Sequence, residues 1–153
     1  FNESENEVRV ELVLSAQTDL LDSGASWIVD SSISNALLLH AASLKRPTFE
    51  AVNAAANRFD EADAAEHLFV FRASSLGFSY AQMVHPTDFV VAEVTFKEER
   101  KLMLRSTLFP ERLEKGVILR SRLRALIVPR GNDIESAATC YRAFAASEHP
   151  LTV

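Results

Sequence analysis

The fold is decided by residues 85–130, which contain three alternating runs in succession: FVVAEVTFK (89–97), KLMLRSTLF (101–109) and GVILRSRLRALIV (116–128). In each run apolar and polar residues alternate with a period of two, which is typical of a half-buried β-strand. Only short polar segments separate the runs. The stretch therefore predicts an antiparallel meander of three strands, with an apolar face that another element must cover.

The second face of this predicted meander is basic. Residues 97–130 contain ten Lys or Arg against four Asp or Glu, although the whole chain has a net charge of −5. On neighbouring strands these cations would repel one another unless Glu93 or an external anion lies among them. The pattern indicates a solvated face, strands paired with acidic helices of the same chain, or a binding site for an anionic partner, such as a phosphate, a carboxylate or an acidic protein. The residues expected to bind such a ligand are Arg105, Arg120, Arg122 and Arg124, with His85 in the turn before the first run.

The rest of the chain supplies further predicted elements. Residues 7–15, 67–73 and 78–84 have the patterns of strands. Residues 33–44 are apolar almost all round and follow Asp30, Ser31 and Ser32, which predicts a buried helix with a polar N-cap that ends before Pro47. A surface helix is expected over residues 48–58. A last helix is expected after Asn132 as its N-cap, with Tyr141 and Phe144 in its buried stripe.

This order of elements predicts one domain, residues 1–153, of the α+β class: an antiparallel sheet wrapped around a buried central helix, plus a C-terminal helix. The only tryptophan, Trp27, is expected in the core. Cys140 cannot form an internal disulfide and is expected to be a small buried side chain on the last helix.

Composition excludes several classes of function. The chain is 48% hydrophobic and 24% charged, and no apolar run approaches the roughly 20 residues of a membrane-spanning helix. No basic and apolar leader is visible, so we expect a cytoplasmic protein without membrane contact. The arginines lack interleaved aromatic residues, which argues against nucleic acid. No histidines, cysteines or acids have metal-ligand spacing, and the four glycines form no phosphate loop, so no metal or cofactor is expected.

One stretch resembles a known family. Gly77-Phe78, followed by Val84-His85-Pro86-Thr87-Asp88-Phe89, resembles the segment of hot-dog dehydratases and thioesterases that reads Phe, a few residues, Val-x-Pro-Gly-Asp and an apolar strand, with Thr87 in the glycine position. The resemblance implies a homodimer with joined sheets and an acyl-thioester site at the N-terminus of the central helix. Dehydratases of this fold carry a histidine before the helix and a glutamate on it, and this chain has neither.

Three residues of the predicted central helix region are the candidates for catalysis under this resemblance. Asp30 would be the base or the N-cap, Asn35 would orient a ligand or cap the helix, and His40 would be catalytic or a satisfied core histidine. We therefore expect an acyl-CoA or acyl-carrier-protein thioesterase, or a non-catalytic module of the same fold that binds a ligand or partner. A third interpretation is a START-like domain that binds a hydrophobic ligand.

Overall fold

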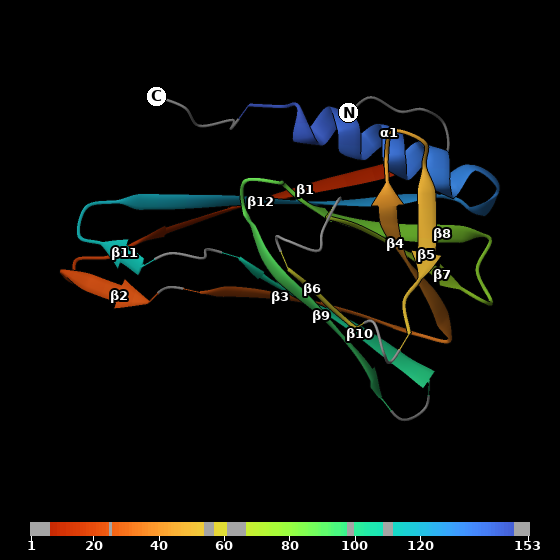
Figure 1. The fold of residues 1–153 in the computed structure, drawn as a ribbon, viewed down its shortest axis with the longest axis horizontal. Coiled ribbons are helices and arrows are strands. Elements are labelled where there is room, and N and C mark those ends of the chain that lie inside the picture. The colour runs from red at the N-terminus through yellow and green to blue at the C-terminus, as the bar shows by residue number, and fades with distance from the viewer. Residues whose placement is uncertain are drawn as a thin grey trace.

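The computed structural model describes residues 7–24, 26–53, 57–60, 67–97, 100–108 and 112–148. Within these residues the chain forms three antiparallel sheets and one α-helix, α1 (Asp133–Ala145) (Figure 1). The protein is therefore mainly β. The prediction of a sheet wrapped around a central helix, and with it the α+β hot-dog-like class, is wrong.

The largest sheet has six strands and contains both the first and the last strand of the chain. Its order is β1 (Val8–Gln17), β12 (Ile118–Pro129), β8 (Phe78–Val84), β7 (Leu68–Ala73), β4 (Ala36–Ser43) and β5 (Thr48–Ala51). A second sheet has four strands in the order β3 (Trp27–Ser34), β10 (Lys101–Leu108), β9 (Phe89–Lys97) and β6 (Arg58–Asp60). Short strands β2 (Asp22–Gly24) and β11 (Arg112–Glu114) pair separately.

The two larger sheets and the helix make three layers with two apolar cores (Figure 1). One core lies between α1 and the six-stranded sheet, where Tyr141 and Phe144 pack on Leu126 and neighbouring residues. The other core lies between the two sheets and includes Phe69, Phe71 and Leu104. The six-stranded sheet is thus the middle layer, which explains why its central strands carry apolar residues on both faces.

Residues 33–44, predicted as a helix, form the end of β3 and all of β4. On β4, Leu39 and Ala41 contact the core beneath α1, whereas Leu38 faces the core between the sheets. A strand that is covered on both faces reads as a continuous apolar run, and this run resembles a buried helix in sequence. Tertiary burial, rather than helical periodicity, accounts for the apolar pattern.

Asn35 lies at the corner where the chain leaves the four-stranded sheet and enters the six-stranded sheet. Its φ is 52°, in the left-handed region that asparagine tolerates better than most residues. Its backbone N–H donates to the carbonyl of Arg100 at 3.0 Å, and its carbonyl accepts from the N–H of Ser74 at 3.0 Å. These bonds fix the corner, and a continuous helix through residue 35 is excluded.

Several other predictions can be compared with the structure. The predicted surface helix over residues 48–58 is wrong, because this segment contributes β5 and the start of β6; residues 54–56 lie outside the described ones. The strands predicted near residues 7–15, 67–73, 78–84, 89–97 and 101–108 are confirmed, as is the last helix with its buried Tyr141 and Phe144. The Asn132 side chain does not cap that helix. Trp27 is 40% exposed, so its assignment to the core is wrong.

The predicted three-stranded meander is only half right. β9 and β10 pair as expected, but β12 lies in the other large sheet, between β1 and β8. Arg105 and the arginines of β12 are therefore not cross-strand neighbours. The basic stretch of sequence is divided between two sheets.

Candidate interaction surface

β1 is an edge strand with unusual features. Over its ten residues it pairs with β12 without a register shift, and no other described strand pairs with its second edge. Its sequence, VRVELVLSAQ, contains no proline, glycine or lysine. Natural proteins commonly use proline, charged residues (lysine above all), bulges or short strands to protect an edge from pairing with another chain. β1 is long and has no proline, lysine or bulge, and its charged residues are Arg9 and Glu11.

One face of β1 exposes a row of apolar side chains. Val8 is 55% exposed, Val10 59% and Leu12 44%, and Ile127, which lies opposite Val8 on β12, is 39% exposed. We call these four residues the apolar shelf. Leu14, two residues further along the same face, packs against the core between the sheets. The shelf is therefore the part of that face that the four-stranded sheet does not cover.

A polar cluster lies on the same face of the six-stranded sheet, next to the shelf. Tyr80 is opposite Ile127 in the register of β8 and β12, and its hydroxyl donates to Gln82 Oε1 at 3.1 Å. Gln82 Nε2 donates to Ser106 Oγ at 3.1 Å, and Ser31 Oγ also donates to Gln82. Burial raises the pKa of Tyr80, although the bond with Ser31 opposes this effect. These bonds tie the two sheets together and separate the shelf from the buried core.

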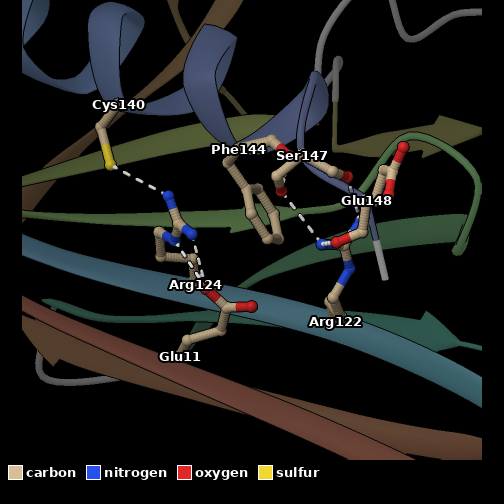
Figure 2. A network of polar contacts seen from close by, with 7 residues as sticks. All are labelled: Glu11, Arg122, Arg124, Cys140, Phe144, Ser147 and Glu148. Carbon is tan, nitrogen blue, oxygen red and sulfur yellow. Dashed lines mark hydrogen bonds and ion pairs between the residues drawn. The ribbon is translucent and has the colours of Figure 1, made fainter. Parts of the chain in front are cut away.

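On the opposite face of the ribbon formed by β1 and β12, Arg122 and most of Arg124 are covered, whereas Arg9 and Glu11 of β1 are exposed. Figure 2 shows Arg122 and Arg124 of β12 on either side of the Phe144 ring from α1. Arg124 Nε donates to Glu11 of β1 at 3.1 Å, and its guanidinium carbon lies 4.5 Å from the centre of the Phe144 ring. Arg122 is 1% exposed, and its guanidinium donates to the carbonyls of Ser147 and Glu148 at 3.0 and 2.9 Å.

Arg122 and Arg124, predicted to bind an external anion, thus contact acceptors of their own chain. Ser147 and Glu148 follow the C-terminal end of α1, where the helix dipole favours a cation. Arg120 lies opposite Ser15 on β1 and is half-buried. His85 is 6% exposed, with Nδ1 2.8 Å from Thr87 Oγ1, and its backbone N–H donates to the carbonyl of Arg122.

Arg105 and Asp30 form an ion pair on the outer face of the four-stranded sheet. Arg105 Nε and Nη2 donate to the two carboxylate oxygens of Asp30, each at 2.9 Å. The bond from Arg105 lowers the pKa of Asp30. In register, Arg105 also lies opposite Glu93, which forms an ion pair with Arg58 on β6. Charges of alternating sign therefore cross all four strands, and Glu93 lies among the cations as the sequence suggested.

The three candidate catalytic residues do not converge on one site. The Asp30 side chain points away from the other large sheet, since Ser31, the next residue, points toward it. His40 is 8% exposed on the inner face of β4, with its ring centre 4.4 Å from that of Phe59 and 5.0 Å from that of Phe69. Asn35 acts through its backbone at the corner between the sheets. There is no helix N-terminus at these residues to bind a thioester oxygen.

Sequence reasoning missed two buried groups that attach α1 to the sheet. Asp133, at the start of α1, accepts bonds from Arg72 Nε and Nη2 at 2.7 Å and from Ser79 Oγ at 2.6 Å. Burial would raise the pKa of Asp133, but the bonds from Arg72 and Ser79 outweigh it, and the pKa is lowered. No local signal in the sequence relates Arg72 to Asp133, because the two residues are far apart along the chain.

His67 is the second buried group. Its ring stacks on Phe89 with 3.8 Å between the ring centres, and its backbone N–H donates to the hydroxyl of Tyr141 on α1. Burial, with a smaller effect of nearby His40, lowers the pKa of His67 to about 4. His67 is therefore neutral at physiological pH.

The remaining features offer little support for a small-molecule or metal site. A surface pocket of about 500 Å³ is lined by Leu44, Lys45, Tyr141, Arg142, Ala145 and Ala146, none of which was predicted as a site residue. Across the described ranges, no group of three or more His, Cys, Asp or Glu could bind a metal ion. Cys140 is buried on α1, as expected. In the part of the chain that the structure describes, no helix is long and apolar enough to cross a membrane.

The exposure of the apolar shelf was not predicted from the sequence. The alternation of residues 7–15 predicts a strand, but nothing in that pattern indicates that its apolar face stays open. Comparison with known proteins gives no independent guide: no family model, no curated protein and no solved structure matches this chain.

Proposed function

We propose that this chain is a non-catalytic protein-interaction module that binds an extended strand of a partner along β1. The observation that supports this function is the combination of a ten-residue open edge with the apolar shelf beside it. Apolar residues exposed singly are ordinary, but a contiguous row on an edge strand is a feature of interaction sites. A flat row of side chains suits a strand better than it suits a small molecule, which binds in a concave pocket.

Strand addition supplies both affinity and selectivity in this proposal. The backbone groups on the open side of β1 would bond to any extended segment, whereas its side chains would select among segments. Val8, Val10 and Leu12 favour a partner with apolar residues at alternate positions. Arg9 and Glu11, on the other face, favour a partner with acidic and basic residues between them.

Acyl-thioester chemistry is not the function that we favour. It depended on a central helix and on Asp30, Asn35 and His40 acting together near its N-terminus. Residues 33–44 form the end of β3 and all of β4, Asp30 forms an ion pair with Arg105, and His40 packs against Phe59 and Phe69. The geometry thus offers that reaction no assembled group of residues.

A peptide selection tests the proposed function. A random library of peptides of about ten residues, the length of a strand, is selected on the wild-type chain, and the enriched peptides are then measured against two variants. Val10→Lys changes the shelf. Ile28→Lys is the matched control, because Ile28 is also an apolar residue on an edge strand and is 52% exposed.

We expect the peptides to bind the wild type and Ile28→Lys equally and to bind Val10→Lys at least tenfold more weakly, since a charge is introduced into the apolar contact. Bound peptide should also slow hydrogen exchange at the backbone amides of β1. Peptides that bind Val10→Lys as well as the wild type would contradict the proposed function, as would failure to enrich any peptide.

A further inference from the structure

We infer that the strand that binds along β1 is β1 of a second copy of this chain, in a single antiparallel register with Val10 on the two-fold axis. This inference rests on the proposed function, because it uses the same edge and the same shelf. It adds the identity of the partner and the pairing of the residues.

The exposure of β1 determines the centre of this register. Residues 8–12 are all exposed, whereas Val13 and Leu14 are half-buried. The longest run of consecutive exposed residues in β1 is therefore five residues long, and Val10 is its midpoint. When two copies of β1 pair antiparallel over the whole of this segment, each residue faces the partner residue whose number, added to its own, gives 20. Val10 then lies opposite Val10 of the partner subunit, and Val8 lies opposite Leu12 of the partner subunit.

The charges of β1 favour the same register. Arg9 lies opposite Glu11 of the partner subunit, and by symmetry this pair occurs twice. Arg9 forms an ion pair with Glu7 of its own chain, but its side chain is 51% exposed and its guanidinium has further donors. Glu11 accepts from Arg124, and its carboxylate can accept from a second guanidinium. Opposite charges on facing residues stabilise antiparallel strands.

Other symmetric registers are less favourable. A two-fold axis at Glu11 places two glutamates opposite each other, and an axis at Arg9 does the same with two arginines. An axis at Leu12 requires Leu14 to take part, but Leu14 already packs against the core between the sheets. An axis at Val8 leaves Leu12 without a facing residue of β1.

The resulting dimer joins two six-stranded sheets edge to edge and places the two apolar shelves side by side. The interface is isologous, as in most homodimers, because each copy contributes the same segment. α1 lies on the opposite face of the sheet from the shelf and is not in the way.

Disulfide trapping tests the register. Facing residues in antiparallel strands have Cα atoms about 4.5 to 5.5 Å apart, a separation that a disulfide can span. Under mild oxidation Val10→Cys should form a covalent dimer on its own. Leu12→Cys should not, but a mixture of Val8→Cys and Leu12→Cys should. The wild type is the control for Cys140, which is buried. Equal trapping of Leu12→Cys and Val10→Cys, or no trapping of Val10→Cys, would overturn the register.

Sedimentation equilibrium tests the dimer itself. The wild type and Ile28→Lys should dimerise with the same dissociation constant, whereas Val10→Lys should remain a monomer. Arg9→Glu places like charges opposite each other twice and should weaken the dimer about tenfold, with a smaller effect at high salt.

The two proposals fail in different ways. If the wild type stays monomeric at every concentration while selected peptides still bind along β1, the self-pairing is wrong and the interaction module stands. If neither peptides nor a second copy engage β1, both proposals are wrong. A wild-type dimer that Val10→Lys does not disrupt would overturn the self-pairing, because its interface would lie elsewhere.

Discussion

In the ribbon formed by β1 and β12, two arginines on one face are covered, whereas several apolar residues on the other face are exposed. On the face beneath α1, Arg122 is 1% exposed, and Arg124 packs against Phe144 while bound to Glu11. On the other face, Val10 is 59% exposed. Arg122 and Arg124 are covered because the Phe144 ring of α1 lies against both cations, and the carbonyls of Ser147 and Glu148, which follow α1, accept from Arg122. The apolar face is open because the four-stranded sheet ends before it. In this ribbon a side chain is buried where another element packs on it, and its own hydrophobicity does not decide this alone.

A leucine-to-alanine substitution on each face of the ribbon gives the strongest test of the difference in burial between the two faces. Leu126 on β12 is fully buried beneath α1, and Leu12 on β1 is 44% exposed. Leu126→Ala should lower the free energy of unfolding by about 3 kcal/mol, because it removes buried methyl groups and leaves a cavity. Leu12→Ala should cost less than about 1 kcal/mol at concentrations where the chain is monomeric. Urea denaturation measures both, and equal losses would contradict the assignment of the two faces.

The second prediction concerns the polar contacts of the covered face. Arg122→Met keeps much of the side-chain volume but removes the donors to the carbonyls of Ser147 and Glu148. We expect a loss of about 2 kcal/mol in the free energy of unfolding, since buried acceptors lose their partner. Hydrogen exchange should quicken in the last turn of α1 before the rest of the helix. Lys115→Met, at an exposed position, is the matched control and should have little effect. An unchanged stability of Arg122→Met would show that these bonds add nothing to the fold.

The third prediction uses pH to change the charge of His67, whose ring stacks on Phe89 in the core between the two large sheets. The pKa of His67 is lowered to about 4, so between about pH 6.5 and pH 4 the unfolded chain binds a proton that the folded chain does not. The free energy of unfolding should therefore fall as the pH decreases through this window, by about 2 kcal/mol from His67. His67→Phe can still stack on Phe89, but it has no imidazole to titrate. Its free energy of unfolding should therefore decrease less than that of the wild type between about pH 6.5 and pH 4. Equal slopes for the variant and the wild type would contradict the prediction.

The smallest effect on the free energy of unfolding is expected for Glu11, which lies on edge strand β1. Glu11→Gln weakens the bond with Arg124, and both side chains are partly exposed. Thermal denaturation of the monomer should show a loss of about 0.5 kcal/mol, which decreases as salt is added. A loss that does not depend on salt would indicate that the Glu11 side chain acts through packing.

The sequence allowed most strands to be predicted but not their partners. Alternation in β1, β9 and β10 is a local signal, and it gave nearly correct strand bounds. The pairing of β12 with β1, however, depends on contacts across the whole chain. The run through Leu38 and Leu39 was read as a helix because a strand that is covered on both faces loses its alternation. Asn35, which breaks this run in the structure with a φ of 52°, was expected to orient a ligand or cap that helix.

The site residues show the same limit. Asp30 and Arg105 were assigned to separate roles, although they lie opposite each other in the register of β3 and β10. The arginines of β12 were expected to need an anion, whereas Arg124 bonds to Glu11 and Arg122 bonds to the carbonyls of Ser147 and Glu148. The apolar shelf could not be predicted from sequence, because the exposure of Val10 depends on where another sheet ends.

The position of β12 between β1 and β8 also has a consequence for synthesis on the ribosome. β1 is made before β12, its only described partner, which follows more than 100 residues later. During that interval β1 has no β12 to pair with. Pairing between strands so far apart in the sequence slows folding. Polysomes bring several nascent copies of the same strand close together at that stage. Premature pairing of nascent β1 strands would compete with the native fold, so the timing of translation through β12 bears directly on the yield of folded protein.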